Sequence, residues 1–191
     1  MKHDNLLFKN NRVITLLFAT VLFASCSKSF EINSHEMGGN IENQKMITDA
    51  TFTGSNNSHL SFKTIFELRQ AKAATAKYQD IENAIADGYV DIAVDVENMG
   101  HHFMKLSLVD GVFDHKRPEI LVYNKDKNGK QRLVAVEYAI PLSEPKPEGF
   151  TGDADVWDGN AGFGLWLLHA WVWEYNPAGV FNSTNSNVHL H

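Results

Sequence analysis

Cysteine is almost missing from this chain, which has a single one, Cys26, among 191 residues. A lone thiol excludes an intramolecular disulfide, so no covalent cross-link can stabilise the fold. Clusters of basic residues are absent after the first twelve positions, and the net charge is −6. Because nucleic-acid binding depends on such clusters, we do not expect nucleic acid to be a partner.

The common catalytic signatures are missing as well. The sequence has no serine or cysteine nucleophile motif, no phosphate-binding loop, no dinucleotide fingerprint and no HExxH pattern. Hydrophobic residues make up 43% of the chain and aromatic residues 11%, as in an ordinary globular protein. No local spacing therefore supports a metal site, and its ligands would each come from a different strand or loop.

The N-terminus has the pattern of a bacterial lipoprotein signal. Basic residues precede a short apolar run that ends in Ala24-Ser25-Cys26. The run is too short to span a bilayer, and the cysteine stands where a lipobox would place it. We expect residues 1–25 to be a signal peptide and Cys26 to carry the lipid that anchors the protein to a membrane of the cell envelope. An ordinary secretory signal is the alternative.

Composition changes twice after the signal. Residues 26–60 are rich in Ser, Asn and Gly and lack apolar periodicity, as in a flexible tether. Residues 61–191 contain periodic apolar segments and predict a single domain.

Residues 64–88 predict one long amphipathic helix. Thr64 and Glu67 have the spacing of a capping box, and apolar residues then recur every three or four positions. Gly88 stands where a left-handed residue would end the helix. We therefore expect a single helix, bent near Asp80, with one face packed on the core.

The segments after the helix alternate in the manner of strands joined by hairpins. One helix followed by such strands indicates an α+β fold, in which a curved antiparallel sheet packs on the helix. A cystatin-like or NTF2-like roll is the nearest common shape by analogy, with its pocket between helix and sheet. The expected strands cover residues 89–96, 119–124, 132–140 and 165–175.

The hairpin around Asn128-Gly129 allows two registers. A two-residue turn would place Glu119 opposite Tyr138, with Glu119 and Glu137 on different faces of the sheet. A three-residue loop with a left-handed glycine would place Glu119 opposite Glu137 on one face. The sequence does not choose between them.

The last expected strand carries an aromatic wall. With period two, His169, Trp171 and Trp173 point to one face of the strand. Together with Tyr138, the two tryptophans could line a pocket for a small apolar or aromatic ligand, or for a partner chain. A lipid-anchored binding module of this kind, without a metal, is one functional hypothesis.

Four blocks of the sequence resemble a family of small bacterial proteins that are secreted or lipid-anchored and have no assigned function. The blocks read NMGHHF, RPEILVY, LVAVEYAIPL and LHAWVWEYNPAGVF, and the resemblance runs from about Thr64 to Asn187. The first block departs from the family pattern, because a polar residue after the second histidine position is replaced. The resemblance implies a site at the shared residues and no reaction.

Imidazoles and carboxylates within these blocks predict a transition-metal site. His102, Glu137 and His169 are the main candidates, and Glu119 and His101 are additional ones. Such ligands suit zinc, copper or non-haem iron, and three of them would leave a position open. Two adjacent histidines in an extended segment face opposite ways, so at most one of His101 and His102 should reach the site.

Two other interpretations use the same residues. A buried Glu137 hydrogen-bonded to His169 would satisfy both groups and have no further role. Alternatively, a glutamate and a histidine could act as a general acid and base without a metal. Neither interpretation identifies a substrate.

Overall fold

The structure is a computed structural model that describes residues 51–52 and 55–190. The predicted signal peptide, Cys26 and most of the predicted tether lie outside the described residues. No helix in the described part is long and apolar enough to cross a membrane.

The packed domain includes part of the segment for which the sequence predicts a tether. Phe52 is 1% exposed, and Leu60 is also buried in the core. Asn57, in the short 3-10 helix η1 (Ser55–Asn57), accepts a hydrogen bond from the Val180 backbone N–H at 3.0 Å. The packed part of the chain therefore begins before residue 61.

The prediction of one long helix is wrong, because the segment is broken into three pieces. The 14-residue helix α2 (Phe62–Thr75) is followed by a 3-10 turn, η2 (Ala76–Gln79), and a short helix, α3 (Ile81–Ala86). The break falls at Asp80, which has an extended backbone and whose carboxylate caps α3 by accepting from the Glu82 N–H. A capping aspartate begins a new helix and cannot continue the old one.

The start of α2 also differs from the prediction. Ser61 is the N-cap, and its hydroxyl accepts from the Thr64 N–H at 3.1 Å. Glu67 bonds the backbone and hydroxyl of Thr151 and does not fold back to complete a capping box. Gly88, with φ of +92°, follows α3 as predicted.

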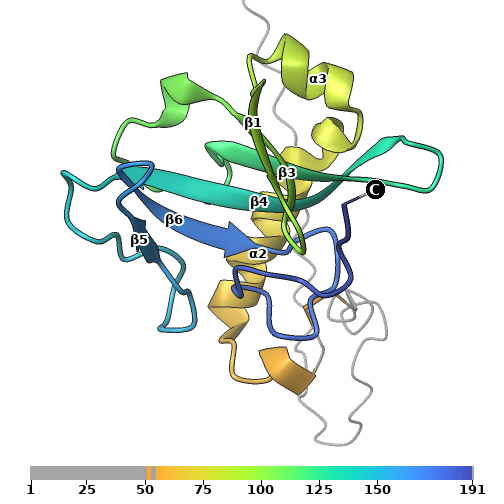
Figure 1. Ribbon diagram of the computed structural model, residues 1–191. Helices are drawn as coiled ribbons and strands as arrows, with labels where there is room; N and C mark the ends of the chain where they lie inside the picture. Colours follow the sequence, from red (N-terminus) through yellow and green to blue (C-terminus); the bar gives the residue numbers. More distant parts are fainter. Residues whose placement is uncertain (1–50, 53–54, 191) are drawn as a thin grey trace, which may run out of the picture. The chain divides into compact units, whose positions relative to one another are not determined.

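Six antiparallel strands form one curved sheet, in the order β1-β2-β3-β4-β6-β5 (Figure 1). This arrangement confirms the α+β class and the curved antiparallel sheet, whereas the roll analogy stays a prediction. The strands are β1 (Val90–Val96), β2 (Gly100–Met104), β3 (Ile120–Lys125), β4 (Gln131–Pro141), β5 (Asp158–Asn160) and β6 (Leu165–Ala170), and a 3-10 helix η3 (Leu106–Leu108) follows β2.

Helix α2 lies across one face of the sheet (Figure 1). On that side, the Tyr123 hydroxyl donates to the Tyr78 carbonyl of η2 at 2.7 Å. Tyr138 packs there against Phe113 and Phe150. Because side chains alternate along a strand, the neighbour of Tyr138, Glu137, points to the opposite face.

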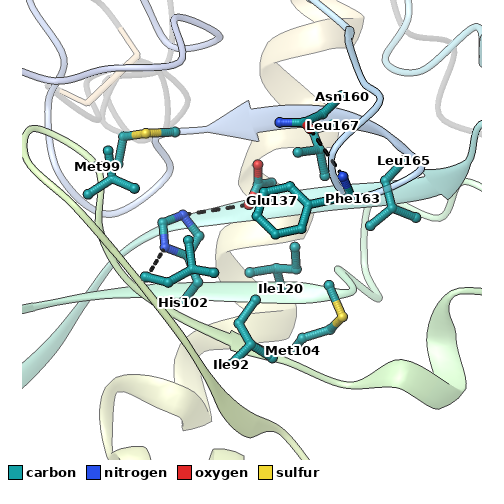
Figure 2. Close-up of a pocket in the computed structure, with 12 residues that line it drawn as sticks. Ile92, Met99, His102, Met104, Ile120, Glu137, Asn160, Phe163, Leu165 and Leu167 are labelled. Carbon is teal, nitrogen blue, oxygen red and sulfur yellow. Dashed lines mark hydrogen bonds and ion pairs between the residues drawn. The ribbon is translucent and has the colours of Figure 1, made fainter.

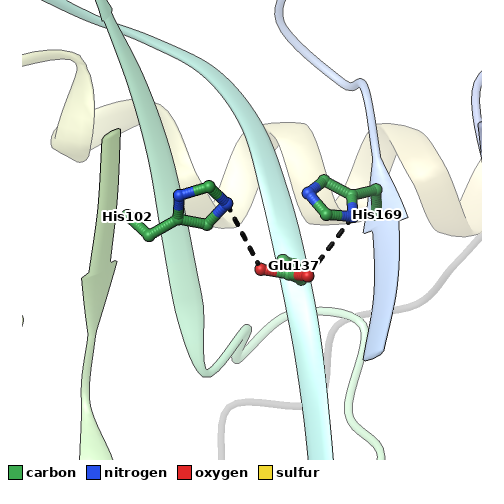
Figure 3. A group of neighbouring side chains, drawn as sticks. All are labelled: His102, Glu137 and His169. Carbon is green, nitrogen blue, oxygen red and sulfur yellow. Dashed lines mark ion pairs between the residues drawn. The ribbon is translucent and has the colours of Figure 1, made fainter. Parts of the chain in front are cut away.

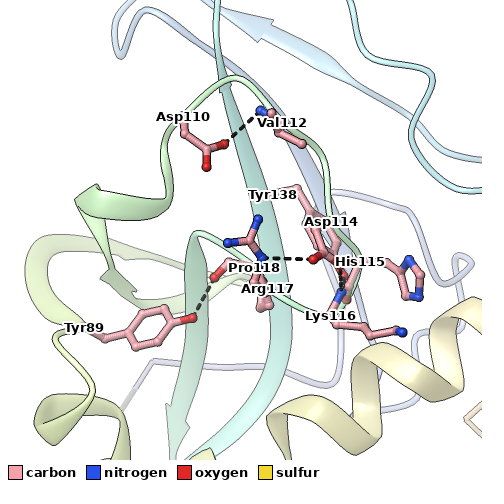
Figure 4. Close-up of polar contacts among 9 residues, drawn as sticks. All are labelled: Tyr89, Asp110, Val112, Asp114, His115, Lys116, Arg117, Pro118 and Tyr138. Carbon is pink, nitrogen blue, oxygen red and sulfur yellow. Dashed lines mark hydrogen bonds and ion pairs between the residues drawn. The ribbon is translucent and has the colours of Figure 1, made fainter.

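The loop between β2 and β3 covers the end of the sheet near α2 (Figure 4). The Tyr138 hydroxyl donates to the His115 carbonyl at 2.8 Å, and the Tyr89 hydroxyl donates to the Pro118 carbonyl at 2.7 Å. Arg117 pairs with Asp114 at 2.9 Å. Two buried tyrosines thus fix this loop through its backbone.

The β3–β4 hairpin combines features of both predicted registers. Its tip is a three-residue loop, in which Gly129 has a φ of +77° and the Asp126 N–H bonds the Lys130 carbonyl. One extra residue, Val134, then forms a bulge in β4, so that Ile120 pairs with Glu137. The bulge shifts the register by one and sends Glu119 to the face opposite that of Glu137.

Candidate metal centre

Three side chains from three strands meet on the face of the sheet that α2 does not cover (Figure 3). They are His102 on β2, Glu137 on β4 and His169 on β6. Each offers one ligand atom, and these atoms lie within 4.8 Å of one another. The main prediction from the sequence, that these residues meet at one point, is confirmed.

The sheet itself creates this convergence. Glu137 and His169 are directly paired across β4 and β6. His102 lies two strands from Glu137, with β3 between them. Because the sheet is curved, the side chains on this face approach across the intervening strand, and the His102 Nε2 comes to 3.7 Å from the Glu137 Oε2.

Two of the separations are longer than good hydrogen bonds and close to the spacing of ligand atoms around one ion. His169 Nδ1 lies 3.3 Å from Glu137 Oε1, and His102 Nε2 lies 3.7 Å from Glu137 Oε2. Good N–H···O hydrogen bonds measure about 2.7–3.2 Å. Bonds of about 2.0–2.2 Å to a tetrahedral ion place neighbouring ligand atoms about 3.3–3.6 Å apart.

An irregular stretch of β1 orients the ring of His102. The register between β1 and β2 shifts between Asp91 and Asp95, and Ala93 adopts a left-handed φ of 55°. Within the shifted stretch, the Val94 carbonyl accepts from His102 Nδ1 at 2.8 Å. That bond places the proton on Nδ1 and leaves the lone pair of Nε2 directed toward Glu137, as a metal-ligating imidazole requires.

Burial determines the protonation of the three groups. The exposed fraction is 3% for His102, 3% for Glu137 and 4% for His169. Loss of solvation lowers the pKa of His169 to about 3, with a smaller contribution from His102, and lowers the pKa of His102 as well. The same burial raises the pKa of Glu137 to about 8. Both imidazoles are therefore neutral, the form that binds metals, whereas Glu137 keeps its proton near neutral pH and would release it on binding an ion.

His169 has one polar atom without a partner. Its Nε2 is buried and makes no hydrogen bond within the described part of the chain. The ring lies nearly parallel to that of Trp171, with the centroids 6.1 Å apart. A buried polar atom of this kind costs free energy, but it is not the atom that faces Glu137, which is Nδ1.

The two additional ligand candidates are not part of the group. His101 turns the other way from His102, as the alternation predicted, and its Nδ1 pairs with Asp95 at 2.7 Å. Glu119 lies on the helix side of the sheet, where its Oε2 accepts from the Ala139 N–H at 3.1 Å. The Val134 bulge is the physical reason that Glu119 cannot join Glu137.

The predicted aromatic pocket is not formed as a single wall. Strand β6 ends at Ala170, so the period-two pattern does not continue through Trp173. Trp171 is fully buried beside His169, whereas the Trp173 indole donates to Thr75 of α2 at 3.0 Å. Tyr138 is fully buried on the helix side. Trp171 and Tyr138 thus belong to the core, and the partly buried Trp173 packs against it.

Glu137 lines two cavities on the face of the sheet away from α2. A cystatin-like or NTF2-like roll would instead have its pocket between helix and sheet. The apolar cavity, about 170 Å³, includes His102 on its wall (Figure 2), and the polar cavity, about 300 Å³, includes His169. Both include Met99, Asn160 and Leu167. The other residues of the apolar cavity are Ile92, Val94, Val96, Met104, Ile120, Phe163 and Leu165, and those of the polar cavity are Val156, Trp157, Asp158 and Ser183.

Sequence reasoning missed the Val94 carbonyl and the two cavities. Residues 89–96 alternate like a regular strand, so nothing in them signals the irregular stretch that aims Val94 at His102. Asn160 is the last residue of β5, in a segment whose Gly/Asp-rich composition signals only a loop.

No family model matches this chain, and no curated protein or solved structure matches it either. The family resemblance therefore stays a prediction.

Proposed function

We propose that this domain binds one divalent transition-metal ion through His102, Glu137 and His169. The observation that carries the proposal is the convergence of three buried ligand atoms within 4.8 Å. Two neutral imidazoles and one carboxylate leave at least one coordination position open for water or another molecule.

The ligand set narrows the choice of metal. Two histidines and a glutamate are the protein ligands of many catalytic zinc sites, and the same set with more open positions binds non-haem iron. Neither sulfur nor a third imidazole belongs to the group, so the site lacks the ligands that select copper in electron-transfer proteins. We therefore expect zinc or ferrous iron, with zinc as the first metal to test.

We further propose that the domain is tethered to a membrane of the bacterial cell envelope through a lipid on Cys26. Support comes from the sequence alone, in which a basic start, a short apolar run and a sole cysteine coincide. A tethered metal-binding domain would then act at the envelope surface.

Metal analysis of the untagged chain tests the metal proposal. We expect about one equivalent of zinc to bind to the parent chain and to be lost in His169→Gln and Glu137→Gln. His189→Gln is the matched control, because this exposed histidine pairs with Glu97, away from the site. Far-UV circular dichroism should show that the variants remain folded.

Zinc binding and thermal unfolding also distinguish a metal site from a Glu137–His169 pair that has only a structural role. If Glu137 and His169 only satisfied each other, zinc would not bind at the micromolar level and a chelator would not change the midpoint of thermal unfolding. That outcome would refute the metal proposal.

A further inference from the structure

The proposed ion would have an unbalanced charge. A divalent cation with two neutral imidazoles and one carboxylate has a net charge of +1, and the three ligands are only 3–4% exposed. Uncompensated charge is costly in such surroundings. A fourth ligand with a single negative charge would make the centre neutral.

Two of the three ligand residues line the apolar cavity. Apart from His102, Glu137 and Asn160, the wall of this cavity is formed by aliphatic, methionine and phenylalanine side chains (Figure 2). Its volume is about 170 Å³. An apolar cavity of about 150 Å³ holds a benzene molecule, so a body of about six to eight carbon atoms fits.

The polar cavity is a poor place for an anion. Asp158 lies on its wall together with Ser183 and Asn160, and a carboxylate there repels another negative charge. An anionic head group therefore reaches the ion more easily from the side of His102, with its hydrocarbon body in the apolar cavity.

We propose that the apolar cavity binds the hydrocarbon body of a small monocarboxylate, whose carboxylate group completes the coordination of the metal ion. This inference rests on the metal-binding function proposed above. It adds the class of molecule that the site accepts, a monoanion with a compact apolar body.

Benzoate and acetate are suitable probes, because they share a carboxylate and differ in the apolar body. Each buried methylene strengthens binding about fourfold, so we expect benzoate to bind the zinc-loaded chain at least about tenfold more tightly than acetate. Isothermal titration calorimetry with the full chain measures both affinities, after the zinc stoichiometry has been measured. Metal-free protein should bind benzoate much more weakly.

A matched pair of variants on β1 locates the binding site. Ile92 lines the apolar cavity and is half-buried, whereas Val90 is 59% exposed and is not part of that wall. Ile92→Trp should fill the cavity and weaken benzoate binding at least about tenfold, without changing the zinc stoichiometry. Val90→Trp should leave both unchanged.

The outcomes separate the two proposals. Absence of zinc binding would overturn the metal-binding function, and this inference with it. Zinc bound by a chain that prefers benzoate no more than acetate, or that binds benzoate equally after Ile92→Trp, would overturn this inference alone.

Discussion

Glu119 is the best residue for testing how the sheet is built, because its placement depends on one bulge. Its exposed fraction is 1%, and burial raises its pKa from 4.5 to about 8, while the bond from the Ala139 N–H partly opposes the shift. The native chain therefore keeps a proton that the unfolded chain releases between these two pH values. This contribution to stability is complete below pH 4.5 and is lost as the pH rises toward 8.

The size of the effect follows from the two pKa values. While only the native state holds the proton, the free energy of unfolding falls by about 1.4 kcal/mol per pH unit. Integrated between pH 5 and pH 8, the loss is about 3 kcal/mol. Glutamine has nearly the same shape, and its carbonyl can accept from Ala139, but it cannot release a proton.

We expect Glu119→Gln to reduce the fall in unfolding free energy between pH 5 and pH 8 by about 3 kcal/mol. Urea denaturation of the metal-free variant and parent chains at four pH values measures the difference between their free energies of unfolding. Glu137 is present in both chains, so its contribution cancels in this difference. Glu148→Gln, at an exposed glutamate, should follow the parent curve. Zinc affinity should be unchanged in Glu119→Gln. A variant curve parallel to that of the parent, or a loss of zinc, would refute the placement of Glu119.

Three further predictions concern the site and its supports. Zinc at a hundredfold excess over its dissociation constant should add about 2.7 kcal/mol to the free energy of unfolding and raise the melting temperature by several degrees. Differential scanning calorimetry measures the shift, and the control variant Glu137→Gln should show none. Gly100→Ala should lower the free energy of unfolding by several kcal/mol, since a Cβ there would lie 2.4 Å from the Tyr123 carbonyl oxygen and φ is +116°. Urea denaturation measures the loss, and a loss below about 0.5 kcal/mol would contradict this packing. Ala93→Gly should stabilise the chain by up to about 1 kcal/mol, because the left-handed φ of 55° is strained for alanine, and a clear destabilisation would count against the irregular β1.

The site was predictable to the extent that alternation along single strands determines it. Glu137 and His169 each belong to a short segment with period-two alternation, and the adjacent histidines had to face opposite ways. Register between strands was not predictable in the same way. Val134 is an apolar residue among similar ones, and nothing local shows that it forms the bulge that separates Glu119 from Glu137.

The predictions of one long helix and of an aromatic wall on the last strand failed for a related reason. Apolar spacing continues across Asp80, but that carboxylate caps α3 and so ends the helical run. In the same way, the alternation from His169 to Trp173 continues in the sequence after the strand has ended at Ala170. Periodicity describes which side chains can be buried, whereas the ends of an element depend on hydrogen bonds that a sequence pattern does not contain.

The irregular stretch of β1 also makes this edge of the sheet a poor surface for pairing with another chain. β1 and β5 are the two outer strands of the sheet, and an outer strand offers unpaired amides and carbonyls to a neighbouring chain. Along the β1 edge, the left-handed Ala93 and the exposed charges of Asp91 and Asp95 interrupt this row of unpaired backbone groups. At the opposite edge, β5 is only three residues long, so it offers few unpaired backbone groups. If the proposed lipid anchor brings copies close together on a bilayer, these edges would oppose their joining into continuous intermolecular sheets.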